Sequence, residues 1–308
     1  MLFAVSALLL VQTAAIDWKK DYESALQEAQ KGSRYVVVFF AGADCPPCAR
    51  MGETTFKDPG VVDHVNRTYV NVYVFLDGPN PVAKQFGVEA VPTIFLVASD
   101  GTRVRKWEGY VGPEDYRKGL DGAAAAHPKL RELEAKLKLD PDSLELNTEA
   151  SKLYEALGRS RSAADALRRA AARVDDPKAR ARMLVRALGH LTMVETDDAL
   201  NEEMLAMAAE AEKLDPEERG EALAVRAQVA MNREKPGEAI TLFEEVVEKH
   251  PACDKAAASL LWLADLYHHA RKDNAKAKKA LERILEKYPK SDVVDDAKAM
   301  LEHLKEHD

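Results

Sequence analysis

Prolines interrupt the second half of the sequence at a nearly constant interval. They separate segments rich in Ala, Leu, Glu, Lys and Arg, and they lie at Pro141, Pro177, Pro216, Pro251 and Pro289. The four intervals are 36, 39, 35 and 38 residues, and no convincing strand pattern occurs after residue 121. A period of about 20–50 residues is the signature of a repeat array. This half of the chain is therefore predicted to be a series of helix pairs.

Self-alignment supports the repeat. The segment FEEVVEKHP, residues 243–251, overlays LERILEKYP, residues 281–289, and the same offset pairs Ala239 with Ala277. Residues 130–308 resemble tetratricopeptide repeats, all-α arrays whose stacked helix pairs form a groove that binds peptides. The resemblance is degenerate between Lys178 and Asp215, and a plain helical bundle is the alternative. It implies a peptide or protein partner in the repeat groove.

The first half alternates between strand and helix patterns. Three continuous apolar runs are YVVVFF at 35–40, YVNVYVFLD at 69–77 and TIFLVAS at 93–99, and a fourth strand is predicted at 103–107. Such alternation predicts a mixed sheet with helices on both faces. We expect Leu120 to close a last short helix, and residues 121–129 to be a linker before the repeats.

Two of the three cysteines lie in the stretch ADCPPCAR, residues 43–50. A zinc site would need four ligands, and only Cys253 and scattered histidines remain, so no metal or other cofactor is expected. In a redox pair, Cys45 would lie at the first turn of a helix that follows a buried strand, where free amides favour the thiolate. Cys48 would lie one turn inside. Pro46 and Pro47 suit the first helical positions, whose N–H groups have no intrahelical partner.

A second proline pattern lies in VEAVPT, residues 88–93. Pro92 stands at the entrance to an apolar strand, where a trans proline would interrupt the ladder of hydrogen bonds. We therefore expect a cis bond between Val91 and Pro92.

These motifs carry a family resemblance. Residues 16–120 resemble a thioredoxin-fold domain and are similar to the periplasmic thioredoxin-like domain of the disulfide-interchange protein DsbD. The resemblance implies an α/β thioredoxin fold and a thiol–disulfide oxidoreductase that acts on disulfide-containing protein clients and needs an upstream protein reductant. It further implies that Cys45 attacks, that Cys48 resolves, and that Val91, Pro92 and Thr93 shape the client-binding groove.

The sequence departs from the family at three places. The Trp that precedes the first cysteine in the family is Asp44 here, and a carboxylate beside Cys45 is expected to raise the pKa of that thiol. The buried Asp of thioredoxin is Phe39 here, which leaves water or Glu53 to assist proton transfer. The Gly-Pro pair of thioredoxin is Pro46-Pro47. Fewer amides and a nearby negative charge predict a reducing couple.

The N-terminal stretch predicts export. An apolar run from Leu2 to Val11 precedes Thr13-Ala14-Ala15, which is typical of a signal peptide over residues 1–15. A retained membrane anchor or a mis-assigned start codon are the alternatives. The expected location is periplasmic or otherwise extracytoplasmic. A net charge of −8 argues against nucleic-acid binding.

The preferred hypothesis is an exported oxidoreductase joined to a repeat scaffold. The alternative is a non-enzymatic adaptor or chaperone in which the cysteine pair is structural. Cys253 aligns with Ser291 of the next repeat and is expected to be structural or incidental. Trp262 and Tyr267 are expected in the core of a helix pair.

Overall fold

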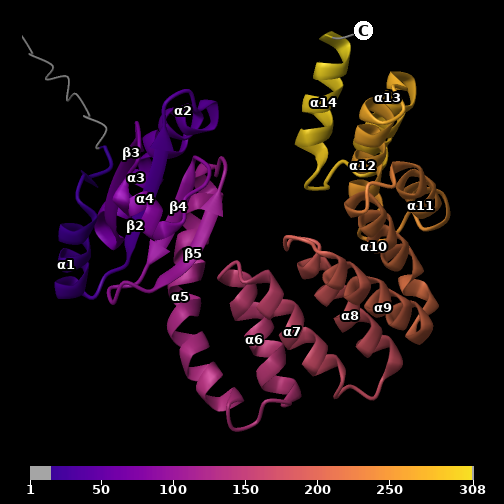
Figure 1. Ribbon diagram of the computed structural model, residues 1–308, viewed down its shortest axis with the longest axis horizontal. Helices are drawn as coiled ribbons and strands as arrows, with labels where there is room; N and C mark the ends of the chain where they lie inside the picture. Colours follow the sequence, from indigo (N-terminus) through magenta and orange to yellow (C-terminus); the bar gives the residue numbers. More distant parts are fainter. Residues whose placement is uncertain (1–14, 307–308) are drawn as a thin grey trace, which may run out of the picture. The chain divides into compact units, whose positions relative to one another are not determined.

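The computed structural model describes residues 15–306, so most of the expected signal peptide at 1–15 lies outside the described residues (Figure 1). The chain forms two compact units. The first contains residues up to 133 together with 153–159, and the second contains 134–152 and the residues from 160 onward. The first is a mixed sheet with helices, and the second is entirely helical among the described residues.

The first unit is built on a five-stranded sheet in the order β1-β3-β2-β4-β5, which confirms the predicted mixed α/β fold (Figure 1). Strand β2 is parallel to β3 and antiparallel to β4, and Phe39 pairs with Tyr73 on one side and Ile94 on the other. Because β2 is central and covered on both faces, its run of apolar residues is continuous instead of alternating. The strands are β1 (Trp18–Lys19), β2 (Val36–Gly42), β3 (Val70–Leu76), β4 (Thr93–Val97) and β5 (Arg103–Glu108).

Helices cover both faces of this sheet. One core packs α3 and α5 against the face that carries Phe39, and the other packs α1 and α4 against the face that carries Phe40. The helices begin at side-chain caps where the sequence supplies them, as at Asp58, which accepts from the Val61 N–H at 2.9 Å. The bounds are α1 (Tyr22–Gly32), α2 (Pro46–Glu53), η1 (Thr55–Lys57), α3 (Pro59–Thr68), α4 (Pro81–Phe86) and α5 (Pro113–Leu137).

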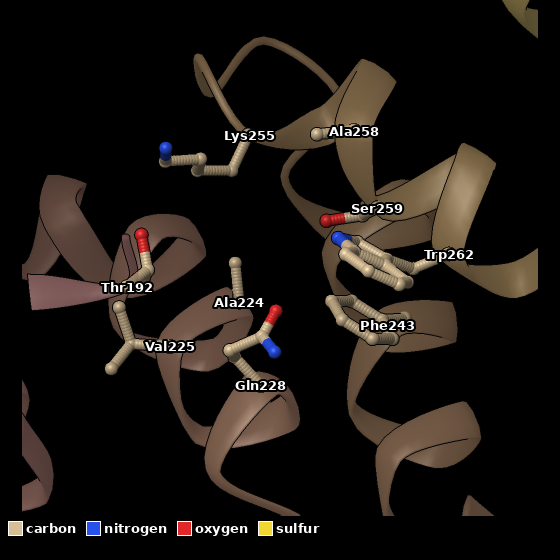
Figure 2. A pocket seen from close by; sticks show the side chains of 9 residues that line it. All are labelled: Thr192, Ala224, Val225, Gln228, Phe243, Lys255, Ala258, Ser259 and Trp262. Carbon is tan, nitrogen blue, oxygen red and sulfur yellow. The ribbon is translucent and has the colours of Figure 1, made fainter. Parts of the chain in front are cut away.

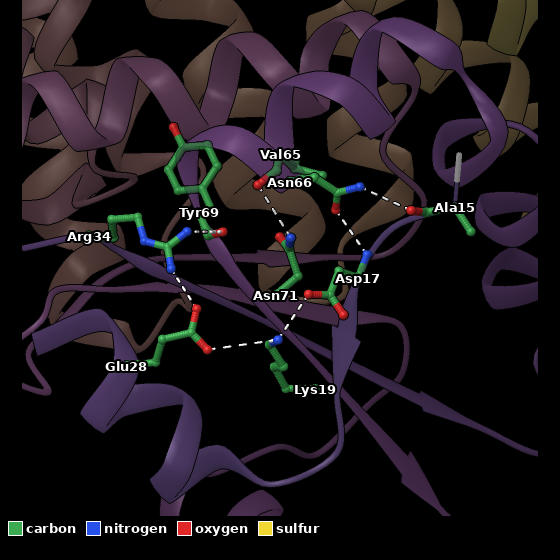
Figure 3. A network of polar contacts seen from close by, with 9 residues as sticks. All are labelled: Ala15, Asp17, Lys19, Glu28, Arg34, Val65, Asn66, Tyr69 and Asn71. Carbon is green, nitrogen blue, oxygen red and sulfur yellow. Dashed lines mark hydrogen bonds and ion pairs between the residues drawn. The ribbon is translucent and has the colours of Figure 1, made fainter. Parts of the chain in front are cut away.

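The sequence pattern that begins at Asp17 and Trp18 predicts a helix, but Trp18 and Lys19 instead form the short strand β1. A network of polar contacts holds this short strand against the sheet (Figure 3). The Asp17 N–H donates to Asn66 Oδ1 at 2.9 Å, and Asn66 Nδ2 donates to the Ala15 carbonyl at 3.0 Å. Lys19 lies 2.9 Å from Asp17 and 3.7 Å from Glu28. The strand's place thus depends on residues of α1 and α3, not on its own sequence pattern.

The prediction of a linker at 121–129 is wrong, because these residues lie within α5. Pro128 has no N–H and leaves the Ala124 carbonyl without its helical donor. The Tyr35 hydroxyl donates to that carbonyl at 3.2 Å and so satisfies it. The inner face of the helix continues through Ala126 and Leu130, both buried in the core. The helix therefore remains continuous at Pro128 because its inner face is buried and because the Tyr35 hydroxyl donates to the Ala124 carbonyl.

The second unit consists of paired helices, as the repeat pattern predicted. The periodic prolines mark helix starts or the turns between helices: Pro177 is the first residue of α8 and Pro216 is the first residue of η2. The degenerate unit between Lys178 and Asp215 still forms a packed pair, with Met204 and Ala208 fully buried. The bounds are α6 (Leu144–Ala156), α7 (Ser160–Ala171), α8 (Pro177–Leu191), α9 (Asp198–Leu214), η2 (Pro216–Glu218), α10 (Arg219–Asn232), α11 (Pro236–Lys249), α12 (Ala256–His269), α13 (Asn274–Lys287) and α14 (Val294–Glu306).

Two expectations about the repeat core have different outcomes. Tyr267 is buried, as expected, and its hydroxyl donates to Glu244 Oε1 at 2.5 Å. Trp262 is 40% exposed, so the expectation that it belongs to the core is wrong. Helical periodicity places a residue on a helix face but does not say how far the neighbouring helix covers that face.

One close approach in the repeats depends on glycine. A Cβ added to Gly220 in α10 would lie 2.7 Å from His250 Cβ and 3.0 Å from Cys253 Cβ. Both neighbours are Cβ atoms fixed to the backbone, so neither can move aside by a rotamer change. Gly189 in α8 is a matched contrast, since nothing lies within 4 Å of its added Cβ.

We predict opposite effects for alanine at these two glycines. Gly220→Ala should destabilise the protein by about 1–3 kcal/mol because the methyl group overpacks the contact. Gly189→Ala should stabilise it by about 0.5–1 kcal/mol through helix propensity. Urea unfolding followed by far-ultraviolet circular dichroism measures both. Equal midpoints for the two variants would contradict the packing at Gly220.

Candidate functional site

The cysteine pair lies where β2 gives way to α2. Cys45 is the N-cap of α2, and Cys45 and Cys48 form a disulfide with their Cα atoms 5.2 Å apart. Pro46 and Pro47 occupy the first helical positions and carry no N–H. The first free amide of the helix is therefore that of Cys48, which donates to Cys45 Sγ at 3.2 Å. The prolines leave one backbone amide facing the sulfur.

The two sulfurs differ in surroundings more than in exposure. Their positions in the helix predict an exposed Cys45 and a buried Cys48, but both cysteines are half-buried. Cys48 packs against the core that contains Phe39, whereas Cys45 Sγ lies 3.5 Å from the carbonyl oxygen of Val91. Cys45 thus faces the loop before β4, and Cys48 faces the interior.

The Val91–Pro92 bond is cis, as predicted. The loop is pinned on both sides of this bond: the Gly109 N–H donates to the Pro92 carbonyl at 2.9 Å, and Thr93 Oγ1 donates to the Ala90 carbonyl at 2.7 Å. Pro92 and Thr93 are buried, and Thr93 is 0% exposed. The Thr93 side chain therefore positions the loop and cannot contact a client. Of the three residues expected at the groove, Val91 is the one that is partly exposed.

An open groove runs beside the disulfide. Asp44, which stands in the left-handed region at φ 51°, is exposed at its rim, and Tyr73 of β3 contributes from the neighbouring strand. Tyr73 was not singled out from the sequence; its place follows from its pairing with Phe39 in the parallel register. The lining residues are Ala41, Gly42, Asp44, Cys45, Pro46, Cys48, Ala49, Gly52 and Tyr73.

Aromatic side chains occupy the interior beside Cys48. Phe39, 2% exposed, has its ring centroid 4.8 Å from that of Phe56, 5.5 Å from that of Tyr73 and 6.0 Å from that of Trp18. Phe39 holds the position at which thioredoxin carries a buried Asp. Glu53, the alternative proton carrier, is exposed at the last residue of α2. The interior behind the disulfide is therefore apolar.

Cys253 lies in the second unit and is not part of this site. Burial, with the nearby carboxylate of Glu221 as a second cause, raises the pKa of the Cys253 thiol to about 11. A thiol with so high a pKa is a poor nucleophile at neutral pH. Its contact with Gly220 fits the structural role expected for it.

The site can exchange disulfides with a second molecule on geometric grounds. It combines a disulfide at a helix N-terminus, a partly exposed sulfur and an adjacent open groove. Among residues 15–306 no group of three or more His, Cys, Asp or Glu residues is placed to hold a metal ion.

Two family models match segments of the chain, one in each half. Residues 22–124 match the Thioredoxin-like domain family, and residues 230–301 match the Tetratricopeptide repeat family. A search of curated proteins found no match.

Three solved structures illustrate the likeness. A thioredoxin from Thermus thermophilus is 28% identical, covering 36% of this chain and 88% of its own, with a TM-score of 0.33. DsbH oxidoreductase is 16% identical, covering 40% and 94%, with a TM-score of 0.34. A tetratricopeptide-repeat protein, also from Thermus thermophilus, is 20% identical, covering 62% and 93%, with a TM-score of 0.42. The assignment rests on the two family matches. The chain therefore combines a thioredoxin-like domain at its N-terminus with tetratricopeptide repeats at its C-terminus.

Proposed function

We propose that the chain is a thiol–disulfide oxidoreductase that reduces disulfide bonds of exported client proteins. The observation that carries the proposal is the Cys45–Cys48 disulfide at the N-terminus of α2, with Cys45 Sγ 3.5 Å from the Val91 carbonyl in an open groove. A partly exposed pair can be reached by a second disulfide, whereas a structural pair is inert because it is buried. This accessibility favours the enzyme over an adaptor with a structural pair.

The exchange proceeds in two displacements. The Cys45 thiolate attacks one sulfur of the client disulfide, which forms a mixed disulfide and releases the other client sulfur as a thiolate. The Cys48 thiolate then attacks Cys45 Sγ, which expels the second client sulfur and closes the Cys45–Cys48 bond. Two electrons pass to the client, and each released client thiolate takes up a proton from solvent.

Reduction of a client leaves the protein oxidised, so each cycle needs an upstream dithiol protein. A compartment in which disulfides persist would otherwise keep the pair closed. The signal-like residues 1–15 support an extracytoplasmic location. None of the helices described over residues 15–306 is long and apolar enough to cross a membrane. The repeats would hold a protein partner, as such arrays commonly do.

We predict that the reduced protein catalyses insulin reduction by dithiothreitol. Cys45→Ser should lower the rate to background because the attacking sulfur is gone. Cys48→Ser, reduced and then freed of dithiothreitol before insulin is added, should accumulate a mixed disulfide with the substrate that is visible on a non-reducing gel. Cys253→Ser serves as the control and should retain the wild-type rate. An unchanged rate in Cys45→Ser would show that the cysteine pair is structural.

A second prediction concerns the order of alkylation in the reduced protein. Cys45 should react first with iodoacetamide because it lies at the helix N-terminus, next to the open groove. Cys253 should react last: with a pKa of about 11, roughly one thiol in a thousand is ionised at pH 8. Mass spectrometry of timed samples gives the order. Faster labelling of Cys48 than of Cys45 would reverse the two assigned roles.

A third prediction is that the couple is reducing. One backbone amide faces Cys45 Sγ, and Asp44 places a negative charge beside it, so the thiolate is weakly stabilised. The midpoint potential should lie nearer thioredoxin's roughly −270 mV than the roughly −120 mV of a strong oxidant. Equilibration with a glutathione redox series measures it, and a midpoint above about −170 mV would mean that the protein makes disulfides instead.

Asp44→Asn provides the matched test of the charge effect. Removing an exposed charge should stabilise the thiolate slightly and raise the midpoint by less than about 20 mV. Glu23→Gln, which removes an exposed carboxylate from α1, serves as the control and should leave the midpoint unchanged.

A further inference from the structure

The groove beside the disulfide lies on the side of Cys45 that faces away from the Val91 loop. In the sheet, β2 lies between β3 and β4, so Cys45, which follows β2, has the loop before β4 on one side and the end of β3 on the other. The lining comes from β2, α2 and Tyr73 of β3, and none of it from β4 or the loop before β4. The groove has a volume of about 680 Å³, enough to admit side chains of a bound client.

Two stacked aromatic rings form a wall on this side, which we call the aromatic wall. The rings of Tyr73 and Phe75 are nearly parallel, with an interplanar angle of 7° and centroids 6.5 Å apart. Behind them, Phe39 and Trp18 hold the Tyr73 ring at centroid distances of 5.5 and 5.8 Å. Phe75 pairs in register with Ala41, which lines the groove, so Phe75 extends the wall beyond Tyr73.

Phe75 is apolar and yet open to solvent. Its exposed fraction of 45% is the largest of any Phe or Trp among residues 15–306. A single exposed apolar side chain is ordinary on a protein surface. Phe75 differs because it continues the wall of a groove that also contains a reactive sulfur. An apolar surface in such a place is typical of a site where another molecule becomes buried.

Covalent geometry brings a client segment to this groove. Two bonded cysteines have their Cα atoms about 5–6 Å apart, and each flanking Cα of the client lies about 3.8 Å further along its chain. Because Cys45 itself lines the groove, the residues next to the client cysteine come within reach of the aromatic wall. Asp44 is the one charged residue of the lining, and it is exposed. Its charge favours a basic client segment over an acidic one.

We propose that the aromatic wall selects clients that carry a bulky apolar side chain next to the reacting cysteine, and that Asp44 favours a basic residue on the other side of that cysteine. The apolar side chain would rest against Tyr73 and Phe75, in space left open by the small residues Ala41 and Gly52. The proposal rests on the proposed oxidoreductase function and names the substrate class of that same site.

The test uses the full-length reduced protein and three short peptides, each with one cysteine joined to thionitrobenzoate by a disulfide. One peptide has Phe before the cysteine, one has Phe after it, and one has Ala at both places. The Cys45 thiolate attacks the peptide sulfur and expels the coloured thionitrobenzoate thiolate, and Cys48 then displaces the peptide thiolate and closes the Cys45–Cys48 bond. Stopped-flow absorbance below saturation gives the second-order rate constants.

At least one of the Phe peptides should react about tenfold faster than the Ala peptide, because the groove removes its ring from water. Whether the faster peptide has Phe before or after the cysteine gives the direction of the client chain along the groove. Equal rates for all three peptides would overturn the proposal.

Variants of Phe75 test the wall through the ratio of the Phe-peptide rate to the Ala-peptide rate. Phe75→Ala should reduce this ratio to about one-third of the wild-type value or less, because half of the stacked pair is lost. Phe75→Tyr keeps the ring and should retain the ratio. Trp262→Ala is the matched control: it removes a 40% exposed ring that lines a small pocket of the second unit (Figure 2) and should leave the ratio unchanged.

The charge preference has its own comparison. With Phe kept at its faster position, Lys on the other side of the cysteine should react about two- to fivefold faster than Glu at low salt, as expected for an exposed charge pair. Asp44→Asn should remove this difference. A difference of the same size in Asp44→Asn would contradict the role given to Asp44.

Other roles of the wall give different results. A lowered melting temperature of Phe75→Ala with the wild-type ratio would show that Phe75 serves only the fold. A dimer that Phe75→Ala dissociates in sedimentation, again with the wild-type ratio, would assign the wall to a second copy of the chain. Either result overturns the proposal. Absence of thionitrobenzoate release from every peptide would instead contradict the oxidoreductase function itself, so the two failures are distinguishable.

Discussion

The complete burial of β2 is the constraint on which the thioredoxin-like domain depends. Its residues from Val36 to Ala41 pack on both faces while the backbone pairs with β3 and β4. A strand held on four sides cannot shift its register without exposing apolar side chains. Its end at Gly42 is therefore fixed, and α2 begins four residues later with Cys45 as its cap. The fixed end of β2 therefore places Cys45 Sγ next to the loop that contains Val91 and Pro92. That loop is itself held by β4 and β5.

The apolar interior next to Cys48 sets the chemistry apart from that of thioredoxin. Phe39 is a buried residue of β2, and it stands at the position of the buried Asp of thioredoxin. The rings of Phe56, Tyr73 and Trp18 pack around it. The polar network at β1 matters here because it holds Trp18 against this group of rings. Packing thus takes the position of a proton carrier, and in the proposed exchange the proton of Cys48 would leave through the groove.

The sequence predicted the elements whose signal is local. Continuous apolar runs marked β2, β3 and β4, the proline before β4 marked the cis bond, and the periodic prolines marked the helix pairs. The features that it did not predict depend on contacts between distant residues. Strand β1 is held by hydrogen bonds to Asn66, and α5 continues through Pro128 with a hydrogen bond from Tyr35. The exposure of Trp262 depends on how far the neighbouring helices cover its side chain. Thr93 was placed at the groove by resemblance, while its burial follows from the pairing of β4.

The return of residues 153–159 to the first unit means that a cut where the family match ends does not release the whole unit. Leu157 is buried in the same core as Phe39, and Arg105 Nη1 donates to the Ala156 carbonyl at 2.6 Å. A fragment that stops at residue 124, where the family match ends, would lose Leu157 and also Leu130 from that core. The shortest autonomous fragment is set by the core and reaches past the first helix of the repeats. Shuffling of the two halves during evolution would have met the same barrier.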